Sequence, residues 1–174
     1  MAEETTAQQQ PLAIKMQFIK DMSFENPNAP MIYPMMSGKA PQLDIQVDVS
    51  PTQLSDTAYE VVLNVRGSAK VEDKTAFMIE LDYGGIVTLA EGLEPQIIDL
   101  LLMVETPRYL FPFARNIVAD ITRDGGFPPL IMNPIDFHQM FLQRRNEEAA
   151  QQANEAMAAD ETDAKAEDKA TETA

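Results

Sequence analysis

The feature that most constrains the fold is a long alternation of apolar and polar residues over LAIKMQFIKDMSFE, Leu12 to Glu25. One set of alternate positions is apolar, with Lys20 as its one interruption: Leu12, Ile14, Met16, Phe18, Met22 and Phe24. The other set is mostly polar: Lys15, Gln17, Asp21, Ser23 and Glu25. A period of two over this length is typical of a β-strand with one buried face and one solvated face. We therefore predict a strand over residues 12–25.

Three later segments repeat this alternation and predict further strands over residues 42–50, 59–71 and 75–85. Their apolar positions are predicted to face inward: Leu43, Ile45, Val47, Val49, Tyr59, Val61, Leu63, Val65, Phe77, Ile79, Leu81 and Tyr83. The link between the last two strands, residues 72–74, is short enough for a hairpin. The order of the segments suggests an antiparallel meander with one solvated face.

After Gly92 the apolar period changes to that of helices. Residues 94–105 are apolar nearly all round, and Pro107 is predicted to break or kink the helix that they form. A second helix over 108–126 ends at Gly125 and Gly126, and a last helix over 135–148 is predicted to start at Asn133-Pro134. The fold class is therefore α+β, a four-stranded antiparallel sheet with C-terminal helices on one face. Because one sheet cannot cover a helix that is apolar all round, we expect a copy of the chain to bury its spare face.

The domain organisation follows from composition. Residues 1–11 are predicted to be a disordered N-terminus, 12–148 a folded domain and 149–174 an acidic disordered tail. From residue 146 to the end the chain has nine acidic and two basic residues and no aromatic ones. Such a segment cannot bury enough apolar surface to fold alone.

Charge and composition exclude several classes of function. A formal net charge of −15 makes nucleic acid an improbable partner and favours a basic one. The chain has no cysteine, which excludes disulfide scaffolds and thiol nucleophiles. The first ten residues lack the features of a secretory signal, and the longest apolar run is too short to cross a membrane. We expect a soluble cytoplasmic protein with no direct membrane insertion.

The residues that carry enzyme chemistry are sparse. His138 is the one histidine, and no serine lies in a nucleophile elbow. We therefore predict no catalytic residue, no cofactor and no metal site. Asp21 with Glu25, and Glu80 with Asp82, form carboxylate pairs on the outward face of two strands. These pairs either serve solubility or form a docking surface for a basic partner, with Met78 as an apolar anchor among them.

Two proline-rich apolar loops raise a second possibility of binding, APMIYPMM over 29–36 and GFPPLIM over 126–132. Pro30 and Pro34 make the first loop a poor helix and a poor central strand. Both loops are either core plugs beneath long connections or adaptable, methionine-rich surfaces that hold other proteins' unfolded segments.

Several phrases of the sequence closely resemble the SecB family of bacterial protein-export chaperones. They are KDMSFENPNAP from Lys20, YEVVLNV from Tyr59, TAFMIELDYGGI from Thr75 and LFPFARNIVADITRDGGFPPLIMNPIDF from Leu110. Together they cover roughly residues 14–142, and the acidic, alanine-rich tail looks like the alphaproteobacterial branch.

The resemblance implies a function, an assembly and two binding surfaces. It implies an ATP-independent holdase that keeps preproteins unfolded and passes them to the translocase motor SecA. It also implies a homotetramer, a dimer of dimers with helices between two sheets. The basic, zinc-bearing C-terminal tail of SecA would dock on Asp21, Glu25, Met78 and Glu80. Clients would bind Met31, Ile32, Tyr33, Met35, Met36, Leu130, Ile131, Phe137, Met140 and Phe141.

Two alternatives remain open from the sequence. One is a SecB-like chaperone dedicated to a single client such as an antitoxin. The other, from a different class, is a small oligomeric enzyme that uses the carboxylate pairs, which would require a deep pocket holding both Asp21 and Glu80.

Overall fold

A computed structural model of the chain describes residues 10–151. The chain divides into two compact units, Met1–Ile135 and Asp136–Ala174, and each is described by itself. The predictions for residues 1–9 and 152–174, the outer parts of the expected disordered ends, lie outside the described residues.

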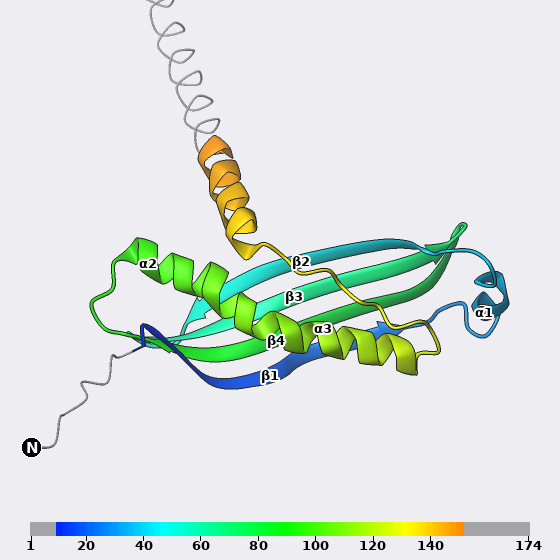
Figure 1. Cartoon of the computed structure of the whole chain (residues 1–174), viewed down its shortest axis with the longest axis horizontal. Helices are drawn as coiled ribbons and strands as arrows, with labels where there is room; N and C mark the ends of the chain where they lie inside the picture. Colours follow the sequence, from blue (N-terminus) through cyan, green and yellow to red (C-terminus); the bar gives the residue numbers. More distant parts are fainter. Residues whose placement is uncertain (1–9, 152–174) are drawn as a thin grey trace, which may run out of the picture. The chain divides into compact units, whose positions relative to one another are not determined.

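The first unit is built on an antiparallel sheet of four strands (Figure 1). The strands are β1 (Leu12–Glu25), β2 (Gln42–Gln53), β3 (Ala58–Val71) and β4 (Lys74–Leu89). All four predicted strands are present, and three of them extend beyond the predicted bounds. The spatial order is β1-β4-β3-β2, so β2, β3 and β4 form a meander while β1 pairs with β4. The prediction of a simple four-strand meander was therefore wrong.

Strand β1 also departs from the predicted assignment of its faces. Two register shifts lie between Ile14 and Met16 and between Ile19 and Asp21, where Lys15 and Lys20 have no partner on β4. Each extra residue reverses the side on which the next side chain lies, as in a β-bulge. Met16 and Phe18 therefore lie on the outward face, contrary to the prediction. Ile19 takes the inward side, and Met22 and Phe24 lie inward as predicted.

The helical layer runs across the inward face of the sheet (Figure 1). It consists of α2 (Pro95–Leu100), the π-helical turn η1 (Leu101–Glu105) and α3 (Thr106–Asp124). The predicted break at Pro107 takes the form of this π turn, where the hydroxyl of Thr106 donates a 2.8 Å hydrogen bond to the carbonyl of Leu101. Helix α3 ends at the predicted glycines, and Gly126 has a φ of 84°, a conformation that glycine adopts without strain.

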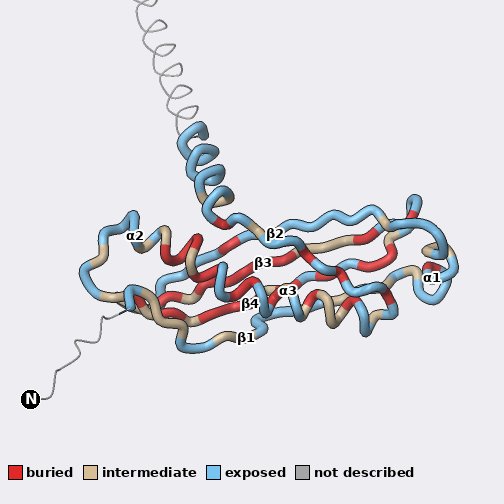
Figure 2. Tube along the Cα trace, in the orientation of Figure 1, coloured by how far each residue is buried: buried red, intermediate tan, exposed pale blue. Residues whose placement is uncertain are grey.

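The core lies between β3, β4 and the middle of the helical layer (Figure 2). Gly85 permits close approach of the helix, because a Cβ atom there would lie 2.8 Å from Leu110 Cδ2. Residues 101–104 are all buried within one protomer. A second copy of the chain is therefore not needed to bury residues 101–104, contrary to the argument from the all-round apolar pattern of this helix. Tyr109 and Phe113, 55% and 53% exposed, are the aromatic side chains of α3 that remain open.

The second unit is described as a single helix over residues 137–151. The backbone N–H of Gln139 donates a 3.0 Å hydrogen bond to Asp136 Oδ1, so Asp136 is the N-cap. The predicted start at Asn133-Pro134 was three residues too early.

Candidate functional site

The outward face of β1 and β4 brings together the four residues predicted to dock SecA. Glu25 pairs with Met78, Ser23 with Glu80 and Asp21 with Asp82 across the two strands. All except Ser23 and Asp82 were named as docking residues from the sequence. We call Asp21, Glu25, Met78, Glu80 and Asp82 the acidic face. The four residues predicted to dock SecA are exposed, while Asp82 is only partly so.

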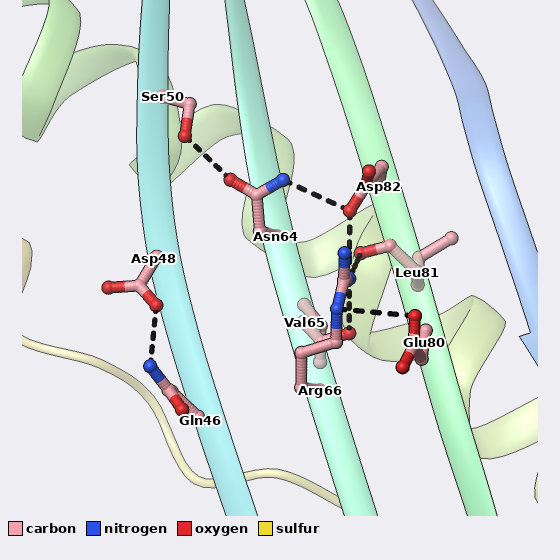
Figure 3. A network of polar contacts seen from close by, with 9 residues as sticks. All are labelled: Gln46, Asp48, Ser50, Asn64, Val65, Arg66, Glu80, Leu81 and Asp82. Atoms are coloured by element: carbon pink, nitrogen blue, oxygen red, sulfur yellow. Dashed lines mark hydrogen bonds and ion pairs between the residues drawn. The ribbon is translucent and has the colours of Figure 1, made fainter.

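Arg66 lies on β3 directly opposite Glu80 and is bound to the acidic face (Figure 3). Its Nη1 donates a 2.8 Å hydrogen bond to Asp82 Oδ1, and its Nε lies 3.5 Å from Glu80 Oε2. Asn64 adds a 3.0 Å hydrogen bond to Asp82, and Ser50 in turn bonds to Asn64. These polar contacts form a network that runs from the acidic face on β4 across β3 to β2.

The environment of Asp82 favours its ionised form. Burial alone would raise the pKa of this carboxyl, but the hydrogen bonds from Arg66 and Asn64 and the charges of Arg66 and Lys20 outweigh it. The pKa of Asp82 is therefore lowered. A carboxyl held in this way is an ion-pair partner rather than a general acid, which requires a raised pKa.

A shallow hollow of about 190 Å³ lies on the same face. It is lined by Asp44, Gln46, Arg66, Gly67, Ser68, Met78, Ile79 and Glu80. Asp21 is not among these residues, so this hollow does not unite the two carboxylates that the enzyme alternative requires. Among the residues that the structure describes, no group of three or more histidine and carboxylate side chains could hold a metal ion.

The first apolar loop, residues 29–36, lies between β1 and β2. It contains the one-turn helix α1 (Ile32–Met35), where the proline pattern predicted no helix. Pro34 is tolerated because it lies in the first turn, where a backbone N–H would have no intrahelical partner. A cis peptide bond joins Ala29 to Pro30 just before this turn.

Tyr33 fastens this loop to the end of α3. Its hydroxyl donates a 2.9 Å hydrogen bond to the carbonyl of Gly125 and accepts one of 2.8 Å from Asn26 Nδ2. Its ring lies 5.4 Å from that of Phe127, which packs 4.9 Å from Phe77. Phe24 completes the group, 5.7 Å from Phe77. We call Phe24, Tyr33, Phe77 and Phe127 the aromatic cluster.

The predicted client residues divide by exposure. Ile32 is completely buried and Leu130 is 8% exposed, so neither side chain is accessible, and their role in client binding stays a prediction. Met31 and Ile131 are 70% and 63% exposed, while Tyr33 is more than a third exposed. Met35 and Met36 are half-buried.

Phe137, Met140 and Phe141 belong to the second unit, on the helix over 137–151. His138 is exposed on the same helix.

Sequence reasoning missed two features of the inward side. It did not identify the aromatic cluster, because only the strand register and the path of the later loop bring Phe24, Phe77 and Phe127 together. It also predicted burial for Leu43 and Ile45, which are 47% and 38% exposed. Both lie on the edge strand β2.

The acidic face and the aromatic cluster lie on opposite sides of the sheet. Phe77 and Ile79 alternate with Met78 and Glu80 along β4, and successive strand residues point to opposite faces.

No helix in the described part of the chain is long and apolar enough to span a membrane.

Comparison with known proteins gives consistent results. The family model described as preprotein translocase subunit SecB matches residues 5–148. The protein-export protein SecB of Rhodospirillum centenum is 48% identical over 131 residues, which cover 75% of this chain and 77% of that protein. The SecB of Rhodospirillum rubrum is 44% identical over 162 residues, covering 91% and 99% of the two chains.

Among solved structures, the SecB-like chaperone of Mycobacterium tuberculosis in complex with a ChAD peptide from an antitoxin has a similar fold. The TM-score is 0.61 at 12% sequence identity, and the match covers 72% of this chain and 91% of that one. At this identity the likeness concerns the fold alone, and it agrees with the predicted α+β class.

Proposed function

The chain belongs to the SecB family and is a protein-export chaperone, and from this premise we propose that it holds unfolded preproteins without ATP and delivers them to SecA. We place this activity in the cytoplasm and assign it no catalytic step. We assign client holding and SecA docking to different surfaces, and the observation that supports this is that the inward side of the sheet is apolar while its outward side is acidic.

Client holding is assigned to the exposed apolar side chains of the two proline-rich loops, residues 29–36 and 126–132. Met31, Ile131 and Tyr33 offer accessible apolar surface, and methionine adapts to many partner shapes. At about 25 cal/mol per Å² of apolar surface removed from water, each such contact is weak. Useful affinity then comes from many contacts along one extended client. A chain that folds quickly buries its own apolar residues first, so slow folders are selected.

SecA docking is assigned to the acidic face. Its exposed carboxylates would attract the basic, zinc-bearing tail of SecA, and the zinc would belong to that partner. Met78, 38% exposed among the charges, would supply an apolar contact. Attraction between charges in water is screened by salt, so docking is expected to weaken as ionic strength rises.

We assign the chain to a homotetramer, a dimer of dimers with helices between two sheets. The exposed Tyr109 and Phe113 on α3 support this assembly, because aromatic side chains are enriched at protein interfaces. Analytical ultracentrifugation tests the assembly directly, and a sedimentation coefficient of a monomer at micromolar concentration would contradict it.

Light scattering of a diluted, unfolded preprotein tests the holding activity. The chaperone should slow aggregation in proportion to its concentration without ATP. No effect on any preprotein would contradict the proposal. Purification from cells then separates the general chaperone from one dedicated to a single client: many preproteins with SecA support the first, and one antitoxin-like partner supports the second.

Glu80→Lys tests the division between the two sides of the sheet. Reversing this charge should abolish the stimulation of SecA, because it places a cation where a basic tail docks. Client holding in the light-scattering assay should persist. If both activities fall together while the variant stays folded, the assignment of separate surfaces is wrong.

A further inference from the structure

Arg66 occupies an unusual position, since it is a cation built into a face that is proposed to bind cations. It lies on a central strand, opposite Glu80 on β4 and Gln46 on β2. Its side chain is 40% exposed, so it is not a buried structural charge.

The two carboxylates that Arg66 contacts are not held equally. Asp82 receives a 2.8 Å hydrogen bond from Arg66 and a second bond from Asn64, and its side chain is 22% exposed. Glu80 lies 3.5 Å from the guanidinium Nε, too far for a strong hydrogen bond, and its side chain is 57% exposed. Arg66 therefore satisfies Asp82 and only partly engages Glu80.

We propose that Arg66 competes with the basic side chains of the partner for the carboxylate of Glu80. Arg66 keeps Asp82 in an internal ion pair, so Asp82 takes no part in docking, and Arg66 must release Glu80 when a basic tail binds. This inference rests on the proposed docking of SecA and names the residue that regulates it. Arg66 acts through Glu80, so it is a positioning residue for the docking contact.

The surrounding geometry gives the exchange room to occur. Arg66, Met78 and Glu80 all line the hollow of about 190 Å³ on this face. An incoming lysine or arginine can approach Glu80 from this side without displacing backbone. The guanidinium can meanwhile keep its shorter bond to Asp82, because its planar fork presents several donors.

If Arg66 competes for Glu80, the affinities of chaperone variants for the basic tail should follow an order that their net charges alone do not predict. Arg66→Gln removes the competitor, so the basic tail should bind more tightly, by about two- to fivefold, the range expected for an exposed ion pair. Asp82→Asn should weaken binding, because Arg66 then turns fully to Glu80. The double variant Arg66→Gln/Asp82→Asn has the net charge of the wild type but leaves Glu80 free, and it should bind about two- to fivefold more tightly than the wild type.

The test uses the full-length chaperone and the zinc-loaded C-terminal tail peptide of SecA from the same bacterium, with Kd measured by calorimetry at low salt. Lys39→Gln is the matched control. It changes the net charge as Arg66→Gln does, but Lys39 pairs with Glu72, outside the acidic face. Arg66→Lys keeps the charge and should bind close to the wild type. Each variant is checked for a native circular dichroism spectrum at the temperature of the titration and for unchanged client holding.

The outcomes separate this inference from the function on which it rests. If the wild type does not bind the tail, or Glu80→Gln binds as tightly as the wild type, the proposed docking fails and this inference with it. If docking behaves as proposed but the double variant binds no more tightly than the wild type, the competition by Arg66 is refuted alone. Tighter binding by the double variant, with Lys39→Gln unchanged, supports the inference.

Discussion

The two faces of strand β4 differ in burial although they belong to the same run of residues. Phe77, Ile79 and Leu81 are buried against helices and loops, while Met78 and Glu80 between them are exposed. Only the pleat of the strand separates these environments. One strand thus carries part of the core on one side and exposed charge on the other, so mutations at adjacent residues should differ greatly in their effect on stability.

The largest expected effect comes from Leu81→Ala. Leu81 is completely buried, and truncation of such a side chain costs about 2–5 kcal/mol of stability. Its neighbour Glu80 is exposed, so Glu80→Gln should change stability by less than about 0.5 kcal/mol. Urea unfolding followed by circular dichroism measures both. Similar losses for the two variants would show that the faces do not differ in the way described.

A second prediction concerns binding on the apolar side. The double variant Met31→Ser/Ile131→Ser removes the most exposed apolar side chains of the two loops and should weaken client holding severalfold. Ile32→Ser is the matched contrast, because it places a hydroxyl at a fully buried position and should destabilise the fold instead. Light scattering measures holding, and binding of the SecA tail should stay unchanged in the double variant. If the Met31→Ser/Ile131→Ser variant also lost binding of the SecA tail, the assignment of client holding and SecA docking to separate surfaces would be wrong.

The smallest predicted effect is a pH dependence from the acidic face. Because the folded-state pKa of Asp82 is lowered, its ionised form contributes stability above the ordinary value of 3.8. That contribution is lost as pH falls from there through the lower folded-state pKa. Asp82→Asn should therefore lose about 0.2–1 kcal/mol at neutral pH and nothing at strongly acid pH. Urea midpoints of wild type and variant between pH 2 and 7 measure the difference; a constant gap would contradict the assignment.

The sequence predicted the regular parts of the fold well, because periodicity reports which side of an element is buried. It located all four strands, and the four residues predicted to dock SecA, Asp21, Glu25, Met78 and Glu80, lie on one face of the sheet. It could not predict that β1 pairs with β4, because alternation identifies a strand but not its neighbour. Nor could it place the two register shifts, which depend on cross-strand packing such as that of Phe18 over Gly84.

The apolar loops were the hardest part to predict. Ile32 and Met31 are adjacent and both apolar, yet one is completely buried and the other is 70% exposed. A short turn such as α1 has too few residues for a period, so composition cannot tell which side chain points inward. The contact that fixes the loop, from Tyr33 to Gly125, joins residues 92 positions apart. Such a contact is set by the tertiary fold.

The bulges of β1 have a consequence for how this strand tolerates insertion and deletion during evolution. Lys15 and Lys20 are the positions without a partner in the ladder, so loss of either residue would leave every other β1–β4 pair in its place. Loss of a paired residue away from the bulges, such as Ser23, would instead shift the residues on one side of it by one position and turn their side chains to the other face. Homologous strands can therefore differ in length at these lysines while every other side chain of β1 stays on the same face of the sheet.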